Sequence, residues 1–268
     1  MNTQPNHVIE IENVSVRYGS RVVLEDVTMS VSSSEIRVIL GPSGCGKTTL
    51  LKVMVGLLAP FSGSVKLFGQ TLGELDSPQT MALLRRIGIL FQNGALLGSL
   101  TVEENVALPL EMHTSLDRSL IREIVALKLS QVGLSASAGL LPQELSGGMR
   151  KRAALARALA LDPPIVFCDE PSAGLDPVTA AGLDELLLTL RKTLSITIVV
   201  VTHELASIKA IADNVVFLHD GHVLYDGDLD KAQHAADGPM NDFFSRTYRA
   251  HGAQQASASS LFVMENRS

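Results

Sequence analysis

The chain contains no tryptophan and only two cysteines, Cys45 and Cys168. Two cysteines cannot build the disulfide framework of a small secreted domain, so we expect a reducing compartment. No apolar run approaches the roughly 18 residues that a bilayer-crossing helix needs, which excludes a membrane-spanning subunit. The start, MNTQPNHVIE, lacks a basic segment followed by an apolar one. We therefore expect no secretory signal and a cytosolic chain.

Positive charge is also scarce. Lys and Arg total 22 against 28 Asp and Glu, giving a net charge of −6 and a pI of about 5.6. Affinity for nucleic acid comes from clustered Lys and Arg, so no nucleic-acid partner is expected. With 268 residues, 46% of them hydrophobic, the chain can form one large domain or two small ones with ample core.

The hydrophobic pattern predicts an α/β fold. Apolar residues alternate with polar ones over Val8–Tyr18 and again at Val27, Met29 and Val31, which is typical of an antiparallel lobe with one solvated face. Unbroken apolar runs instead indicate strands buried on both faces of a mainly parallel sheet. These runs cover Ile36–Leu40, Ile87–Phe91, Ile165–Cys168 and Ile196–Val201.

Helical signals fill the segment from Gln92 to about Asp162. Thr101 and Glu104 have the spacing of a capping box, and an apolar stripe follows. Asp176 followed by Pro177 predicts a further helix through about Leu190. The stripe comprises Leu120, Ile121, Ile124, Val125 and Val132.

These patterns divide the chain into two parts. Residues 1–230 are predicted to form one domain, with a helical subdomain at about 93–162 and a hairpin turn at Asp220–Gly221. Residues 231–268 are predicted to be a partly disordered extension, because 251–260 carry few large apolar residues before LFVM at 261–264.

A phosphate-binding loop follows the first buried run. The sequence GPSGCGKT matches GxxxxGK[ST], in which backbone N–H groups surround a phosphate, the lysine reaches the β and γ phosphates, and the threonine ligates Mg²⁺. A glycine-rich turn without a ligand is the alternative, but a buried strand before the motif and a helix after it favour the phosphate loop. The predicted nucleotide-binding residues are Gly41, Pro42, Ser43, Gly44, Cys45, Gly46, Lys47, Thr48 and Thr49.

An acidic pair ends another buried strand. Asp169 and Glu170 follow IVFC, and ligands of parallel sheets lie at the carboxyl ends of strands. Asp169 can therefore hold Mg²⁺ with Thr48, and Glu170 can polarise a water for attack on the γ-phosphate. A solvated pair of acids at a strand end is the alternative.

The ordered motifs resemble a known family. The phosphate loop, LSGGM at 145–149, Asp169–Glu170, SAGLD at 172–176 and His203 after a buried strand together resemble the ATP-binding-cassette ATPases, over about Val8–Asp228. The resemblance implies that Tyr18 stacks on adenine, Gln92 senses the metal and the lytic water, His203 contacts the γ-phosphate, and Asp176 communicates between subunits. It also implies that Ser146, Gly147 and Gly148 bind the γ-phosphate of a second copy's ATP.

The last assignment has independent physical support. A serine and two glycines at a helix start present free N–H groups and a positive dipole end, which suit an anion. Because the chain already has one phosphate loop, a second anion site suggests two chains sharing nucleotides head to tail. An ordinary capped helix is the alternative.

Other positions also leave alternatives open. Met149 replaces the family's usual Gln, with little expected loss because the serine and backbone make the site. Arg150, Lys151 and Arg152 oppose the helix dipole, so they form either a solvated face or a positive field beside the neighbour's nucleotide. Taken singly, Tyr18 could be sheet packing and His203 structural.

The chain also resembles a subfamily, the bacterial ATPases of MCE-type (Mla-like) phospholipid transport between inner and outer membranes. This resemblance rests on Phe91–Leu110 and on LSGGMRKRAALARALALDPP. It implies ATP hydrolysis that powers a separate transmembrane permease, an MCE-domain protein, a STAS-domain regulator, and a peripheral place on the inner membrane's cytoplasmic face.

Two other functions stay open. One is an importer ATPase for amino acids or similar solutes, because SAGLDP is the general cassette form. The other, a soluble non-transport cassette, is disfavoured because the cassette is single and uninterrupted. The apolar Phe91–Leu110 segment is either core or a notch for a permease helix, with Leu96, Leu97 and Leu100 as the expected contact.

Overall fold

The computed structural model describes residues 7–234 and 237–245, and its N-terminal part forms an antiparallel sheet in the order β2-β1-β4-β5. Apolar side chains such as Ile9 and Ile11 alternate along these strands and are buried. The predicted antiparallel lobe is therefore confirmed. The strands are β1 (His7–Tyr18), β2 (Arg21–Ser32), β4 (Ser62–Leu67) and β5 (Gln70–Thr71).

A second sheet has the order β10-β9-β3-β8-β7-β6 and is parallel except for the β9–β10 hairpin. That hairpin turns at Asp220–Gly221, as predicted. The expectation of a fully buried run at Ile87–Phe91 is wrong, because β6 is the edge strand and leaves Ile87 and Ile89 half-buried. The strands are β3 (Ile36–Leu40), β6 (Ile87–Leu90), β7 (Ile165–Asp169), β8 (Thr197–Val201), β9 (Asn214–His219) and β10 (His222–Asp228).

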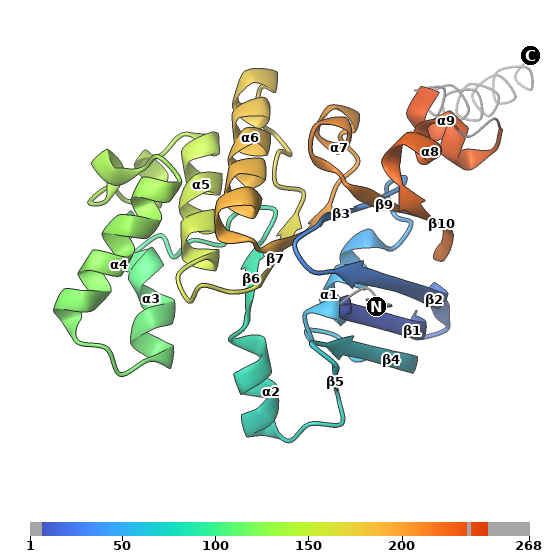
Figure 1. Ribbon diagram of the computed structural model, residues 1–268, viewed down its shortest axis with the longest axis horizontal. Coiled ribbons are helices and arrows are strands. Elements are labelled where there is room, and N and C mark those ends of the chain that lie inside the picture. Colours follow the sequence, from blue (N-terminus) through green and yellow to red (C-terminus); the bar gives the residue numbers. More distant parts are fainter. Residues whose placement is uncertain (1–6, 235–236, 246–268) are drawn as a thin grey trace, which may run out of the picture.

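The two faces of the parallel sheet belong to different apolar clusters. Val38 and Val200 point into one cluster, while Ile39 and Val201 point into the other, as the period of two in a strand requires. Helix α1 (Lys47–Met54), α2 (Ser77–Leu84) and the antiparallel sheet pack on the second face. The remaining helices cover the first face, and Figure 1 shows α3, α4 and α5 at the opposite end of the molecule from β1 and β2.

Between Gln92 and Pro163 the chain contains helices and loops but no strand. It forms α3 (Val102–His113), α4 (Arg118–Gln131), the short 3₁₀ turns η1 (Ser135–Ser137) and η2 (Pro142–Glu144), and α5 (Gly147–Ala158). The capping box at Thr101 and Glu104 is present. Of the predicted α4 stripe, Ile121 and Val125 are buried but Leu120 is exposed. Leu120 lies one residue, or about 100°, around the helix from Ile121 and so leaves the core face.

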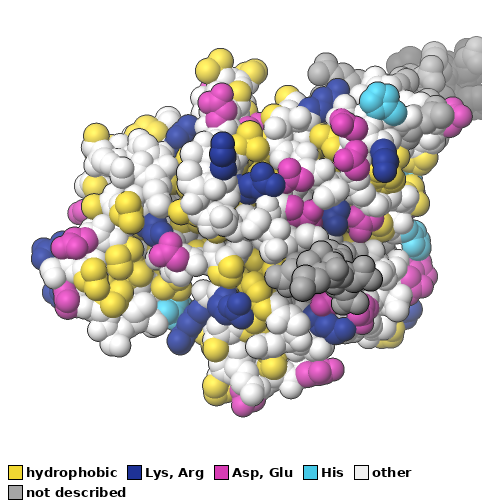
Figure 2. All heavy atoms as spheres, in the orientation of Figure 1, with side chains coloured by type: hydrophobic (Ala, Val, Ile, Leu, Met, Phe, Trp, Pro, Cys, Tyr) yellow, Lys and Arg dark blue, Asp and Glu magenta, His cyan; other side chains and the backbone are white. Residues whose placement is uncertain are grey.

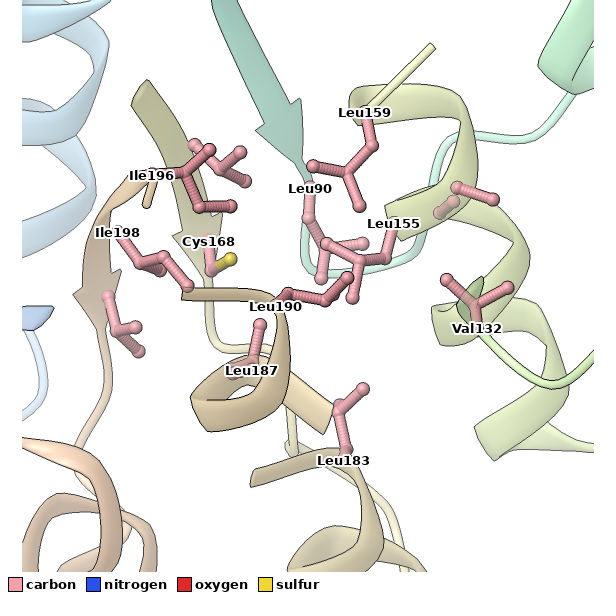
Figure 3. Close-up of a cluster of buried hydrophobic side chains, with 14 of the residues drawn as sticks. Leu90, Val132, Leu155, Leu159, Cys168, Leu183, Leu187, Leu190, Ile196 and Ile198 are labelled. Carbon is pink, nitrogen blue, oxygen red and sulfur yellow. The ribbon is translucent and has the colours of Figure 1, made fainter. Parts of the chain in front are cut away.

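This helical segment shares its core with the parallel sheet. Figure 3 shows Val132 and Leu155 of the segment in one cluster with Leu90 of β6, Cys168 of β7 and Leu190 of α6. A subdomain with a separate core would not pack in this way. Helix α5 therefore packs directly on the parallel sheet.

The C-terminal part adds four helices. Helix α6 (Pro177–Leu194) starts at the predicted cap Asp176 but runs past Leu190, and α7 (Leu205–Ile211), α8 (Leu229–Gln233) and α9 (Pro239–Ser245) follow. Ala232 and Phe243 are buried in the core, so the described part of 231–245 packs on the domain. The predicted disorder at 251–260 and the LFVM segment lie outside the described residues.

Two surface properties complete the architecture. No helix in the described part of the chain is both long and apolar enough to cross a membrane.

A groove between α3 and α4 has an apolar floor that includes Ile121 and Val125, with acidic and basic side chains such as Glu111 and Arg122 at its rim. Figure 2 shows apolar side chains over this pair of helices, between acidic and basic ones.

Candidate active site

The loop between β3 and α1 is shaped by glycine. Gly41 has φ 151° and Gly46 has φ 109°, both outside the usual range for other residues. A Cβ atom on Gly41 would lie 2.0 Å from the Leu218 carbonyl oxygen, and one on Gly46 would lie 2.6 Å from a Leu24 methyl carbon. The start of α1 has no side-chain cap and no acidic residue in its first turn, so its N–H groups stay available for an anion.

Lys47 points back into this loop. It is 7% exposed, and its Nζ atom donates hydrogen bonds to the carbonyl oxygens of Gly41 (2.8 Å) and Pro42 (2.9 Å). A buried ammonium group beside the uncapped start of α1 suits the β and γ phosphates of a nucleotide.

The candidate metal ligands Thr48 and Asp169 meet beside the loop. The Thr48 hydroxyl donates to Asp169 Oδ1 at 3.4 Å. Burial, followed by the charge of Glu170, raises the pKa of Asp169, and a bound cation would offset that cost. The described residues contain no group of three His, Cys, Asp or Glu that could hold a metal. One hydroxyl and one carboxylate fit Mg²⁺, which keeps waters and binds substrate phosphates.

Glu170 adopts an uncommon backbone conformation, with φ 45°, which costs about 1–3 kcal/mol in a residue other than glycine. Its carboxylate oxygens are held by two neighbours that follow β8. Thr202 Oγ1 donates to Oε2 at 3.2 Å, and His203 Nδ1 lies 2.7 Å from Oε1. Because a carboxylate can only accept, His203 Nδ1 carries the proton of that bond. The carboxylate is therefore oriented from two sides.

The segment at Gln92 reaches the same place through its backbone. Lys151 Nζ donates to the carbonyl oxygen of Gln92 and, at 3.0 Å, to that of Glu170. The structure thereby joins Gln92, Glu170 and His203 around the acidic strand end. Gln92 itself is exposed, so its side chain can extend toward solvent or a ligand.

A second group of predicted residues lies at the starts of α5 and α6. Ser146 caps α5 by accepting a hydrogen bond from Met149 N at 3.2 Å. A Cβ on Gly148 would lie 2.4 Å from Thr179 Cγ2, so this glycine lets α5 and α6 approach closely. Asp176 caps α6 and accepts from Thr179 Oγ1 at 2.5 Å. Hydrogen bonds from Thr179 and the helix start lower the pKa of Asp176.

This second group is separated from the phosphate loop by the sheet. Helix α5 packs on the face that carries Val38, whereas α1 packs on the opposite face. Ser146, Gly147, Gly148 and Asp176 are therefore placed with one another rather than with Lys47. Ser146 and Asp176 are exposed.

Tyr18 ends β1 and is 50% exposed. It pairs with Arg21 across the β1–β2 turn, and Val23 of the same β2 strand has its carbonyl oxygen 3.1 Å from the Cβ position of Gly46. Tyr18 is thus connected to the phosphate loop through β2, in which Val23 lies two residues after Arg21. Its ring is half exposed, so a ligand can reach it.

The expected solvated face at Arg150–Arg152 is wrong for two of its three residues. Lys151 is 6% exposed, and Arg152 donates to the carbonyl oxygens of Val132 (3.1 Å) and Gly182 (2.9 Å). Only Arg150 is exposed. Lys151 and Arg152 lie in the second turn of α5, beyond the first turn where the dipole acts most strongly, and both donate to backbone carbonyls of other segments.

Sequence reasoning missed Thr202, which orients the Glu170 carboxylate. The only available signal was its place directly before His203.

The two cysteines are both buried. Burial raises the pKa of the Cys45 thiol and raises that of Cys168 to about 12, which disfavours the reactive thiolate form of both and agrees with a small packing role for Cys45.

Known proteins match the chain at the level of sequence. Residues 24–173 match the ABC transporter family. The intermembrane phospholipid transport system ATP-binding protein MlaF of Haemophilus influenzae is 41% identical over 82% of this chain and 84% of that protein. The Escherichia coli K12 protein of the same name is 38% identical over 88% of both chains. The probable ribonucleotide transport ATP-binding protein mkl of Mycobacterium tuberculosis is 42% identical, but the match spans only 61% of it.

Solved structures match the fold. A dimeric ATP-binding cassette, MJ0796, bound to ADP and Pi, is 32% identical with a TM-score of 0.75, over 82% of this chain and 98% of that one. The cassette cbiO1 from Clostridium perfringens is 29% identical with a TM-score of 0.78, over 84% and 90%. With the phosphate loop, the acidic strand end and the capped α5 in place, these matches confirm the predicted fold class. The chain belongs to the ABC transporter family and is one of its ATP-hydrolysing cassettes.

Proposed function

We propose that this chain powers phospholipid transport between two bacterial membranes, as the ATPase subunit of an ABC transporter. The observation that carries the proposal is the similarity to two MlaF proteins over more than four fifths of the chain. The mkl proteins, described as ribonucleotide transporters, are equally similar over the shared part but extend well beyond it. Amino-acid import and a soluble non-transport role are not better supported.

The chemistry is assigned to the residues around the β3, β7 and β8 strand ends. The phosphates of ATP lie in the Gly41–Thr49 loop, and Lys47 contacts the β and γ phosphates. Glu170 accepts a proton from the attacking water, while Thr202 and His203 fix the direction of its carboxylate. Thr48 and Asp169 would hold Mg²⁺, which neutralises charge on the phosphates.

Other residues contact ATP from the sides. Gln92 senses the metal and the water, His203 contacts the γ-phosphate, and Tyr18 stacks on adenine. Ser146, Gly147 and Gly148 contact the γ-phosphate held by a second copy, and Asp176 contacts that copy. Because the sheet separates α5 from α1, two chains arranged head to tail complete two sites. The similarity to a dimeric cassette bound to ADP and Pi supports this arrangement.

The partner in the membrane is a separate permease, which places this chain on the cytoplasmic face of the inner membrane. Its docking contact is assigned to the loop before α3, where Leu97 is 46% exposed, while Leu96 packs against the core and Leu100 is half-buried. Buried Asn105 fixes this loop by donating to the carbonyls of Leu97 and Leu100 at 3.1 Å and accepting from Leu97 N at 2.8 Å. An MCE-domain protein and a STAS-domain regulator belong to the same complex.

Purification of the tagged full chain from membranes in detergent tests the proposal. Mass spectrometry should identify a permease, an MCE-domain protein and bound phospholipid. After reconstitution into phospholipid vesicles, ATP should drive lipid transfer, and Glu170→Gln should abolish the transfer while keeping the complex assembled. A complex that contains a solute permease and carries nucleotides or amino acids would contradict the phospholipid assignment.

A further inference from the structure

The signature helix α5 sends cationic side chains to the backbone of the candidate catalytic segments. Lys151 donates to the carbonyl oxygens of Gln92 and Glu170. Six residues later, Arg157 donates to those of Gly94 (2.8 Å) and Ala95 (2.7 Å). Three carbonyls of one short loop and one of the acidic strand end are therefore bonded by two side chains of a single helix.

Burying the Lys151 ammonium group costs free energy, so its contact with the two carbonyls is not an ordinary surface interaction. The side chain is 6% exposed, and burial lowers the pKa of Lys151 despite the nearby Cys168, Glu170 and Asp169. In the described structure its bonds go to neutral carbonyls, and it forms no ion pair within 4.0 Å. A methionine would fill the same space without bringing an ammonium group into the protein.

The contact with Glu170 bears on the backbone conformation of that residue. Glu170 is in the left-handed region at φ 45°, a conformation that persists only where the surroundings enforce it. Its N–H donates to Val201 O at 2.8 Å, and its carbonyl accepts from Lys151 and from Ala173 N at 3.2 Å. Lys151 is the side chain among these partners, and it fixes the turn that aims the carboxylate at Thr202 and His203.

The contact with Gln92 holds a second segment, the loop that follows β6, against α5. Gly94 has φ 73°, and a Cβ there would lie 3.4 Å from Ala154 Cβ of α5, so the loop lies directly on the helix. We propose that Lys151 is a positioning residue that fixes the backbones of Gln92 and Glu170 relative to each other, so that the water-sensing residue and the base share one geometry. This inference rests on the proposed roles of those two residues.

The test compares two buried lysines in the full-length protein. Lys151→Met removes both donors, and Lys128→Met is the matched control, because Lys128 is 2% exposed and pairs with Asp162 on the edge of the helical segment. Misplacing a base by about 1 Å costs up to ~10²-fold, so we expect kcat of Lys151→Met to fall about 10- to 100-fold. The KM for ATP and the affinity for a fluorescent ATP analogue should stay within about threefold.

Further variants separate positioning from simple stability. Lys128→Met should lower the melting temperature while kcat stays near that of the wild type. Lys151→Arg, whose guanidinium can donate to two carbonyls, should recover much of the kcat, and Lys151→Gln, which keeps one amide donor group, should fall between. If Lys151→Met does not fold, Lys151→Gln decides the matter in the same way.

Different results would contradict the assignment of Glu170 as the base and the positioning role of Lys151. In a Glu170→Gln background, Lys151→Met should lower kcat by less than about twofold further, because the two changes act through one group. Wild-type turnover in Glu170→Gln would overturn the base assignment and this inference with it. Slow turnover in Glu170→Gln, together with wild-type kcat in a folded Lys151→Met or a loss that matches Lys128→Met, would overturn the Lys151 inference alone.

Discussion

The chain has two helix starts with the composition of a phosphate site, and they are built differently. The start of α1 lies in a bent glycine loop with no side-chain cap, and Lys47 lies over it, buried. The start of α5 is capped by its own Ser146, and the buried cation of its second turn, Lys151, donates to the backbone carbonyls of Gln92 and Glu170. The first can surround a phosphate alone. The second offers an exposed edge that can only complete a site begun elsewhere.

The surroundings of the two starts repeat this difference. Near α1, the side chains of Thr48, Asp169, Glu170 and His203 bond one another across strand ends. Near α5, the polar side chains of Ser146 and Asp176 bond within their own helix starts. The proposed catalytic groups therefore lie together at the strand ends beside α1, and the proposed recognition groups lie at the starts of α5 and α6. Each prediction below removes or weakens one side of this contrast.

The largest effect is expected from the base. Glu170→Gln keeps the shape of the side chain but cannot accept the proton, so turnover should fall about 10²- to 10⁴-fold while ATP binding is retained. The variant should also accumulate as an ATP-bound dimer. Steady-state hydrolysis and size-exclusion chromatography with ATP measure both.

A neighbouring acid provides the control for that variant. Glu204→Gln changes an exposed carboxylate 3.7 Å from His203 Nε2, and its turnover should stay within about threefold of wild type, since a surface contact of this kind is weak. Equal turnover in Glu170→Gln and wild type would place the base elsewhere.

The next largest effect is expected on the affinity for nucleotide. Lys47→Ala removes a charge-assisted contact to two phosphates, so affinity for Mg·ATP should fall by about 10²-fold or more. Titration with a fluorescent ATP analogue measures it. Lys52→Ala, on the exposed side of the same helix, should bind normally, and unchanged affinity in Lys47→Ala would remove this lysine from the site.

A linked pair of cassettes tests the shared site directly. With Lys47→Ala in one copy and Ser146→Arg in the other, both changes strike the same nucleotide and leave the second site intact. With both changes in one copy, each site is damaged once. The first arrangement should bind about one ATP tightly per linked pair and the second none. Identical occupancy in the two arrangements would contradict the head-to-tail dimer.

Much of this contrast could be predicted from the sequence. Motif order located the phosphate loop, the acidic pair and the capped α5, because glycine, caps and buried strands are local features. The inward turn of Lys151 and the bond from Thr202 could not be predicted, since each depends on which carbonyl or carboxylate another segment brings close. Leu120 and Ile87 were misjudged for the same reason: apolar character does not say whether a neighbour covers the residue.

The smallest effect on the isolated chain should come from the proposed docking loop. Leu97 is 46% exposed, so Leu97→Asp places a charge in water and should leave the melting temperature within about 1–2 °C of wild type. The loop backbone stays fixed by Asn105, and the site residues are untouched. If a permease helix packs on Leu97, however, the new carboxylate would be buried against it without a partner, which is unfavourable. Pull-down of the co-expressed permease should therefore be lost. Leu96→Asp is the control, because Leu96 packs against the core, and it should lower the melting temperature clearly. Normal pull-down by a stable Leu97→Asp variant would move the docking surface away from this loop, and with it the direct mechanical path from a permease to Gln92, five residues earlier in the chain.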